Sequence, residues 1–167
     1  MKKYLFIVEK PSIQKIIEKV YEENKTSLGY LADFVSSTKP VSHISDKIRI
    51  IDVTNPIWEK LVLKNIEIQE GYYIVNSEFA SKKNKEIRAL INSNDYDIIV
   101  NACDPGLYGQ LSYEHVKEDI GFSMPEKRMW FTDLTDESVL KSLQEFKDNN
   151  EVLKALLKEC KDSGTYY

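Results

Sequence analysis

A continuous apolar run opens the chain and predicts a buried strand. Residues Tyr4 to Val8 show no polar alternation, which is typical of a strand with both faces covered in a parallel sheet. The segments Asp97 to Ala102 and Arg128 to Thr132 are two further strand candidates. The chain therefore has at least three segments suited to one sheet.

Between these runs the apolar positions recur every three or four residues, which predicts amphipathic helices. The first begins at Pro11, a residue suited to a first helical turn, and ends near Asn24. Others are expected at 81–92, 108–120, 137–146 and 151–160, although Gly109 disfavours the second of these. Thr135 or Asp136 is the expected N-terminal cap of the helix at 137–146.

The alternation of strands and helices predicts an α/β fold, with a mainly parallel central sheet and helices on both faces. We expect one domain over residues 1–148. Within it, residues 26–79 form an irregular insertion of short strands and loops, because their apolar pieces are broken by glycines and prolines. Residues 149–167 are expected to form a C-terminal helix and a frayed tail.

The composition is that of a folded, soluble protein, with 42% apolar and 30% charged residues. Lysine plus arginine total 23 and aspartate plus glutamate 27, so the net charge of −4 permits only a local basic surface. Cys103 and Cys160 have neither disulfide nor zinc-site spacing. The short apolar run after Met1 is unlike a signal peptide. We expect a cytoplasmic protein without a membrane segment.

Two acidic residues follow predicted strands and are candidates for a metal site. Glu9 ends the first strand and Asp104 follows the second. In an open α/β sheet, ligands bind outside the carboxyl ends of the strands, and carboxylates are suitable ligands for Mg²⁺. The alternative is that each acid only interacts favourably with the positive end of the helix that follows it.

Three segments, in order, resemble one known family. Leu5–Ser12, Ile99–Leu111 and Pro125–Glu137 are similar to the first strand and turn, the second acidic motif and the closing strand and helix of the TOPRIM domain in type IA DNA topoisomerases. The bacterial topoisomerase III branch is the most similar. The resemblance implies a Rossmann-like TOPRIM fold.

The resemblance also implies roles for three residues. Glu9 matches the acid that serves metal coordination and proton transfer at the cleaved phosphodiester, and Lys10 matches the neighbouring cation that stabilises the phosphate. Asp104 matches the first metal-binding acid of the second motif. On this basis Glu9 and Lys10 are the candidate catalytic residues, and Glu9 and Asp104 are the candidate magnesium ligands.

The second motif departs from the family pattern. Leu107 stands where the family has an arginine, and Tyr108 stands where it has an acid. These changes imply a degenerate site whose magnesium binding is weak or lost. The family's nucleophilic tyrosine lies in a separate domain for which this chain has no room, so the resemblance implies no independent topoisomerase activity.

The predicted partners are DNA, single-stranded DNA in particular, and another protein. Besides Lys10, the candidate DNA-binding residues are four cations of one predicted helix, Lys82, Lys83, Lys85 and Arg88, although such a run is commonly a solvated face. Three hypotheses follow: a module that associates with DNA or a partner, a magnesium-dependent nuclease or phosphotransferase of the wider TOPRIM class, and a protein-binding module without DNA contact. The sequence does not indicate an oligomeric state.

Overall fold

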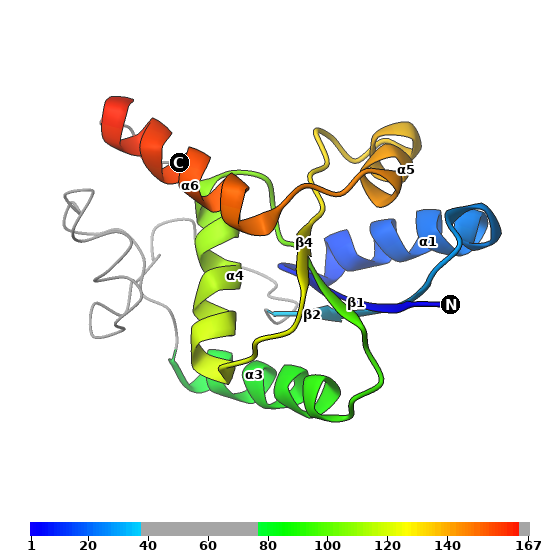
Figure 1. The fold of residues 1–167 in the computed structure, drawn as a ribbon, viewed down its shortest axis with the longest axis horizontal. Coiled ribbons are helices and arrows are strands. Elements are labelled where there is room, and N and C mark those ends of the chain that lie inside the picture. Colours follow the sequence, from blue (N-terminus) through cyan, green and yellow to red (C-terminus); the bar gives the residue numbers. More distant parts are fainter. Residues whose placement is uncertain (38–76, 164–167) are drawn as a thin grey trace.

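The protein is an α/β sandwich built on one parallel sheet (Figure 1). The computed structural model describes residues 1–37 and 77–163, and for residues 77–83 and 160–163 it describes the backbone only. The strands are β1 (Lys3–Val8), β2 (Leu31–Ser36), β3 (Ile98–Ala102) and β4 (Glu126–Arg128). Their order across the sheet is β2-β1-β3-β4, and each neighbouring pair is parallel.

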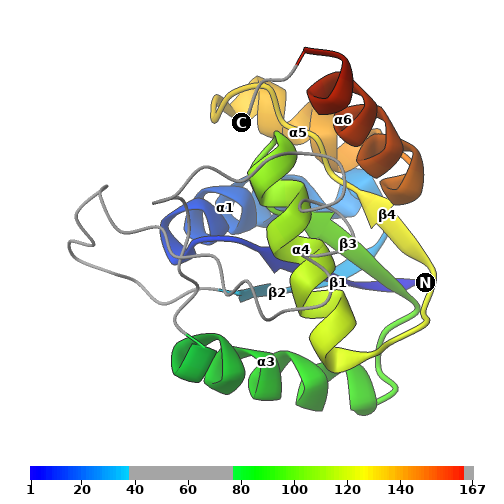
Figure 2. The same ribbon diagram turned by 90° about the vertical axis from the view of Figure 1, so that its left-hand side faces the viewer.

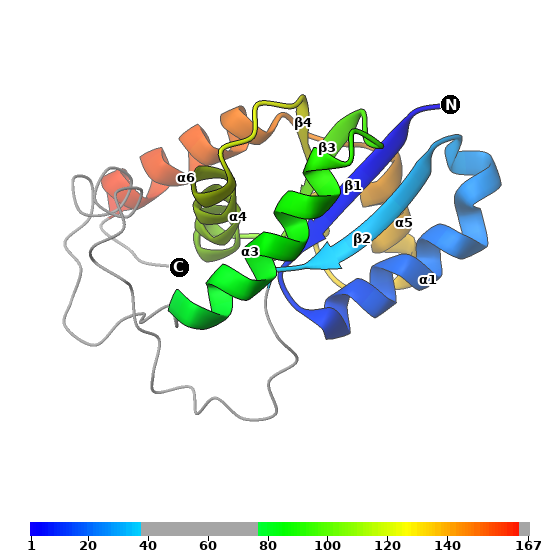
Figure 3. The ribbon, with the colours of Figure 1, turned by 90° about the horizontal axis from the view of Figure 1, so that it is seen from below.

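Helices cover both faces of this sheet (Figure 3). Helices α1 (Pro11–Leu28) and α5 (Asp136–Gln144) lie on one face, and α3 (Ser77–Asn92) and α4 (Leu107–Ile120) lie on the other. A last helix, α6 (Asn149–Ser163), packs against α4 and β4 (Figure 2). The predicted α/β class, with a parallel sheet and helices on both faces, is confirmed.

Alternation along β1 supplies both halves of the core. Tyr4, Phe6 and Val8 face α1 and α5, whereas Leu5 and Ile7 face α3 and α4. Full burial of one such side chain contributes about 1.5–3 kcal/mol relative to exposure. Because β1 packs against helices on both faces, each of its central positions must be apolar.

Several boundaries differ from the sequence-based expectation. Helix α1 continues to Leu28, where Gly29 ends it in the left-handed conformation with φ 76°. Of the segment expected to be irregular, residues 26–28 belong to α1, 31–36 form the regular edge strand β2 and 77–79 belong to α3. Residues 38–76 lie outside the described residues, as does the tail at 164–167. Strand β4 covers 126–128 rather than 128–132, and Arg128 also forms an isolated antiparallel bridge with Lys147.

The helix starts follow the expected local chemistry. Pro11 occupies the first turn of α1, and the Thr135 hydroxyl accepts a hydrogen bond from the Ser138 amide at 3.3 Å and so caps α5. Among the helices of the described ranges, none is both long enough and apolar enough to cross a membrane.

Candidate acidic site at the carboxyl edge of the sheet

Two neighbouring strands bring the candidate metal ligands together. Strands β1 and β3 pair in parallel, with Val8 opposite Ala102. Glu9 directly follows β1 and Asp104 lies two residues beyond β3, so both acids leave the sheet at the same edge. The sequence-based expectation that neighbouring strands place these residues in one location agrees with the structure.

The half-buried Glu9 carboxyl group lies between two partners. The Ser112 hydroxyl on α4 donates a hydrogen bond to its Oε1 at 3.1 Å, and the Asp104 carboxyl lies within hydrogen-bonding reach. Burial first, and then the neighbouring Asp104, raise the pKa of Glu9 to about 8. Near neutral pH, Glu9 is therefore an acid that can hold or release a proton.

One oxygen of the Asp104 carboxylate contacts a cation, and the other has no hydrogen-bond donor. Its Oδ2 lies 3.7 Å from the Nζ of Lys10, whose side chain is 60% exposed. Its Oδ1 is buried and accepts no hydrogen bond within the described part of the chain. A buried carboxylate oxygen without a donor is costly, and either a shared proton or a cation would satisfy it.

Gly109 allows the start of α4 to lie against the backbone of Asp104. A Cβ at this position would lie 2.7 Å from the carbonyl carbon of Asp104, 2.9 Å from its nitrogen and closer still to its oxygen. Only glycine fits there. The glycine that disfavours this helix in isolation is thus the residue that lets the helix approach the acidic site.

The two substituted positions of the second motif bring no charge to the site. Leu107 is buried at the first turn of α4, and Tyr108 is half-buried beside it. Gln110 is fully buried, and its amide nitrogen donates to Glu114 and Asn149 rather than to either acid of the pair. The acidic site therefore consists of Glu9, Asp104 and Lys10 with Ser112.

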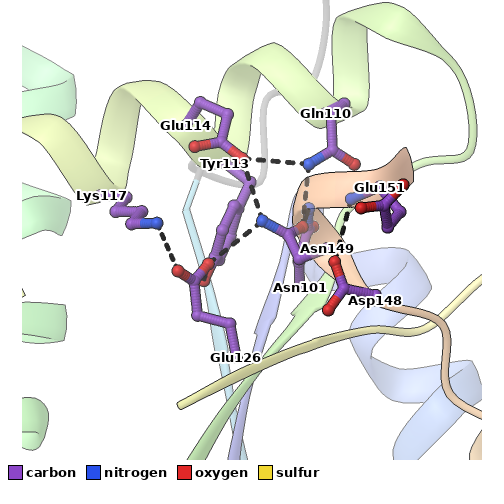
Figure 4. Close-up of polar contacts among 9 residues, drawn as sticks. All are labelled: Asn101, Gln110, Tyr113, Glu114, Lys117, Glu126, Asp148, Asn149 and Glu151. Atoms are coloured by element: carbon purple, nitrogen blue, oxygen red, sulfur yellow. Dashed lines mark hydrogen bonds and ion pairs between the residues drawn. The ribbon is translucent and has the colours of Figure 1, made fainter. Parts of the chain in front are cut away.

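A second polar cluster is centred on Asn149 and fastens α6 to the core (Figure 4). The Asn149 side-chain oxygen accepts from Asn101 at 3.0 Å and from Gln110 at 2.8 Å. Its side-chain nitrogen donates to Glu114 at 3.0 Å and to Glu126 at 3.1 Å. One buried amide thereby joins β3, α4 and β4 to the first residue of α6.

The same cluster continues along α4 to β4. Glu126 accepts a hydrogen bond from the Tyr113 hydroxyl at 2.8 Å and forms an ion pair with Lys117. Burial raises the pKa of Glu114, although hydrogen bonds from Asn149 and Gln110 oppose that shift. Because amide groups occupy the space between these carboxylates, the cluster has the character of a structural clamp and not of a metal centre.

Arg128 is a fully buried cation that fastens the end of β3. Its guanidinium donates to the carbonyl oxygens of Asn101 at 3.2 Å, Cys103 at 2.6 Å and Asp104 at 2.9 Å. Burial lowers the pKa of Arg128 to about 10. The guanidinium remains charged at neutral pH and supports the acidic site through the backbone.

The basic helix α3 does not meet the acidic site at the positions whose side chains are described. Arg88 donates to the carbonyl oxygen of Asp119 at 2.9 Å, near the end of α4 and about 20 Å along that helix from Leu107. Lys85 is exposed. The side chains of Lys82 and Lys83 lie outside the described set, so a DNA-binding role for this helix stays a prediction.

The donor set fits a weakly held magnesium ion. Mg²⁺ commonly takes one or two protein carboxylates and completes its octahedron with water and substrate phosphate, and Glu9 with Asp104 supplies two carboxylates and one oxygen that lacks a donor. No group of three or more His, Cys, Asp or Glu side chains suited to a metal ion occurs among the residues that the structure describes.

Sequence reasoning missed two residues of this region, Ser112 and Arg128. Ser112 follows Asp104 by eight residues and faces Glu9 only because α4 packs back over the sheet, whereas Arg128 belongs to a segment expected to be plain strand. Neither position carries a local signal of its contact. Their roles depend on long-range packing.

Comparison with known proteins relates most of the chain to one kind of enzyme. A putative DNA topoisomerase 3 of Staphylococcus aureus (strain bovine RF122 / ET3-1) is 26% identical over 162 residues, which cover 89% of this chain and 21% of that protein. DNA topoisomerase 3 of Bacillus subtilis (strain 168) is 23% identical over 158 residues, covering 90% and 21% respectively. The chain thus spans about a fifth of the length of these curated relatives. No family model matches it.

Among solved structures, full-length topoisomerase I from Thermotoga maritima is a neighbour with a TM-score of 0.49 and 12% sequence identity. The alignment covers 88% of this chain and 21% of that one. The curated relatives, together with the parallel sheet and the acids at its carboxyl edge, agree with the resemblance found in the three sequence motifs.

Proposed function

We propose that this chain, a TOPRIM-like domain related to DNA topoisomerase 3, is a module that associates with single-stranded DNA and has no topoisomerase activity of its own. The observation that carries the proposal is the meeting of Glu9, Asp104 and Lys10 at the carboxyl edge of the sheet. The replacement of two charged motif positions by Leu107 and Tyr108 supports the absence of strand cleavage and rejoining.

Lys10 is the residue most directly suited to a phosphate of the DNA backbone. Its ammonium group is exposed, and its 3.7 Å contact with Asp104 orients it above the acidic site. An exposed ion pair of this length is weak, so a phosphate oxygen can compete for the cation. The module would hold DNA mainly through such charge contacts, with the salt dependence that they bring.

We further propose that Glu9 and Asp104 hold a magnesium ion weakly when DNA is bound. The ion would offset phosphate charge beside the two carboxylates. Glu9, whose pKa lies at about 8, must lose its proton to act as a ligand, and Ser112 orients the carboxyl group in either state.

Fluorescence anisotropy of a labelled oligothymidylate would test the proposed module. Binding is expected at about 50 mM salt and should weaken as salt rises. Lys10→Gln should make the slope of log K against log salt less negative by about 0.7, the value for one phosphate of a single strand. The matched control is Lys158→Gln, an exposed lysine on α6. Absence of binding at low salt would contradict the proposal and favour a protein-binding module without DNA contact.

One observation favours a second function, magnesium-dependent cleavage or transfer at a phosphodiester. A carboxyl group with a pKa of about 8 can serve as a general acid or base near neutral pH. Incubation of labelled single-stranded DNA with Mg²⁺ or Mn²⁺ separates the two functions. Cleavage by the wild-type protein that disappears in Glu9→Gln would establish the nuclease and overturn the binding-only module.

A further inference from the structure

Trp130 occupies an unusual position beside the acidic site. It lies two residues past the end of β4, whose neighbour in the sheet is β3, the strand that precedes Asp104. Its neighbours Met129 and Phe131 are buried in the core, whereas the indole of Trp130 is only half-buried. The indole ring therefore lies partly at the protein surface, at the carboxyl edge of the sheet, and not in the core.

Two cations lie over the indole ring, one inside the protein and one at its surface. The Cζ of the buried Arg128 is 5.0 Å from the ring centre, and the Nζ of the exposed Lys147 is 5.3 Å from it. The buried guanidinium is fixed by its carbonyl acceptors. Among the described residues, none forms an ion pair or hydrogen bond with the Lys147 ammonium, which lies over the indole.

Arg128 connects this ring to the acidic site. The guanidinium that lies against the indole also donates through Nη2 to the Asp104 carbonyl oxygen at 2.9 Å. A nucleotide whose phosphate is near Lys10 and Asp104 would therefore have an aromatic surface and a second cation within the reach of a neighbouring nucleotide.

We propose that Trp130 is a stacking platform for a base of single-stranded DNA and that Lys147 binds the adjoining phosphate. This inference rests on the proposed DNA-binding function and names a subsite for it. An aromatic ring at the surface beside an exposed cation is a combination by which proteins hold single strands without sequence preference. Base stacking displaces the Lys147 ammonium from the ring, and the displaced group then meets the phosphate backbone.

Two acidic residues close in sequence to this subsite, Asp133 and Asp148, have hydrogen-bond partners within the protein. Asp148 follows Lys147 in sequence, and its Oδ1 accepts the Glu151 amide at 2.9 Å at the start of α6. Asp133 accepts hydrogen bonds from Thr135. Both carboxylates thus serve helix starts rather than neutralising Lys147.

The experiment uses the fluorescence of Trp130 itself. The chain has two tryptophans, so the full-length variant Trp58→Phe reports on Trp130 alone. Titration of this variant with oligothymidylate should quench its emission, and an abasic oligonucleotide of equal length should bind about tenfold more weakly. The reporter retains Trp130, so the measurement does not depend on the stability of a variant at that position.

Variants of the ring and its cation complete the test. Trp130→Leu should bind base-containing and abasic strands equally, Trp130→Phe should restore most of the preference for bases, and Lys147→Gln should weaken both strands alike. Equal binding of both strands by Trp58→Phe, with unchanged emission, would overturn the stacking subsite while leaving DNA association intact. Failure to bind either strand at low salt would overturn both the subsite and the proposed function.

Discussion

Gly109 and Asp104 lie in backbone contact across the turn between β3 and α4. A side chain at Gly109 would overlap the main chain of Asp104, with a Cβ only 2.7 Å from its carbonyl carbon. The overlap involves backbone, which cannot rotate away as a flexible side chain would. The position of the Asp104 carboxylate thus depends on the absence of a Cβ on the following helix.

Gly109→Ala is therefore expected to destabilise the protein by about 3 kcal/mol, at the upper end of the usual cost of overpacking. The control is Gly121→Ala, where the Cβ meets open space but φ is 75°, and a cost of about 1–2 kcal/mol is expected from the left-handed conformation alone. Urea unfolding of both variants measures the difference. Equal losses of unfolding free energy in the two variants would show that the backbone around Asp104 shifts to accommodate the added methyl group without cost.

The buried Glu9 carboxyl group should make the protein less stable as pH rises. Its folded-state pKa is about 8 against an ordinary value of 4.5, so the native state binds the proton more tightly than the unfolded state does. The stabilising contribution is complete below pH 4.5 and is lost progressively up to about pH 8. One proton limits the slope to about 1.4 kcal/mol per pH unit.

Glu9→Gln should flatten that part of the pH profile, because the amide stays neutral and can still accept the Ser112 hydrogen bond. We expect the variant to melt at a higher temperature than the wild type above about pH 8, where the wild-type carboxylate is buried in its charged form. Glu118→Gln, an exposed position on α4, is the control. Parallel profiles for wild type and Glu9→Gln would refute the coupling between Glu9 and stability.

Magnesium binding should tighten with pH for the same reason. An ion at Glu9 and Asp104 competes with the Glu9 proton, so the apparent affinity should rise by up to about tenfold per pH unit below the pKa and level off above it. Amide chemical shifts around the two strand ends, followed during Mg²⁺ titration at about pH 7 and about pH 9, measure the change. A pH-independent affinity would place the ion elsewhere.

Asn149→Ala should loosen the last helix. The substitution removes four side-chain hydrogen bonds and leaves the carboxylates of Glu114 and Glu126 with fewer donors inside the protein. A loss of about 2–3 kcal/mol is expected for such a buried group. The neighbouring Asn150→Ala, at an exposed position, should change stability by less than about 0.5 kcal/mol. Hydrogen exchange along α6 would locate the effect.

The sequence predicts the central strands and the acidic pair because each depends on local pattern. Tyr4 to Val8 is apolar throughout, and Glu9 must lie at the sheet edge once that run is a strand. Parallel pairing with β3 then brings Asp104 to the same location. These steps need only periodicity and the geometry of an open α/β sheet.

The sequence pattern does not predict strand β2 or the hydrogen bonds of Asn149, and the two cases have different causes. As an edge strand, β2 is partly solvated and includes the exposed Asp33, so its pattern resembles that of a loop. Asn149 meets Asn101 and Gln110 across 48 and 39 residues of sequence, and nothing local distinguishes it from Asn150. Buried polar partners of this kind are set by tertiary packing.

Because one guanidinium touches both the indole of Trp130 and the carbonyl of Asp104, two neighbouring positions on the carboxyl edge of the sheet are linked through Arg128. A displacement of the ring would shift the main chain that carries the acid, and a displacement of the acid would shift the ring. Binding of a ligand at one of these positions would then alter the affinity at the other, by the same factor in each direction.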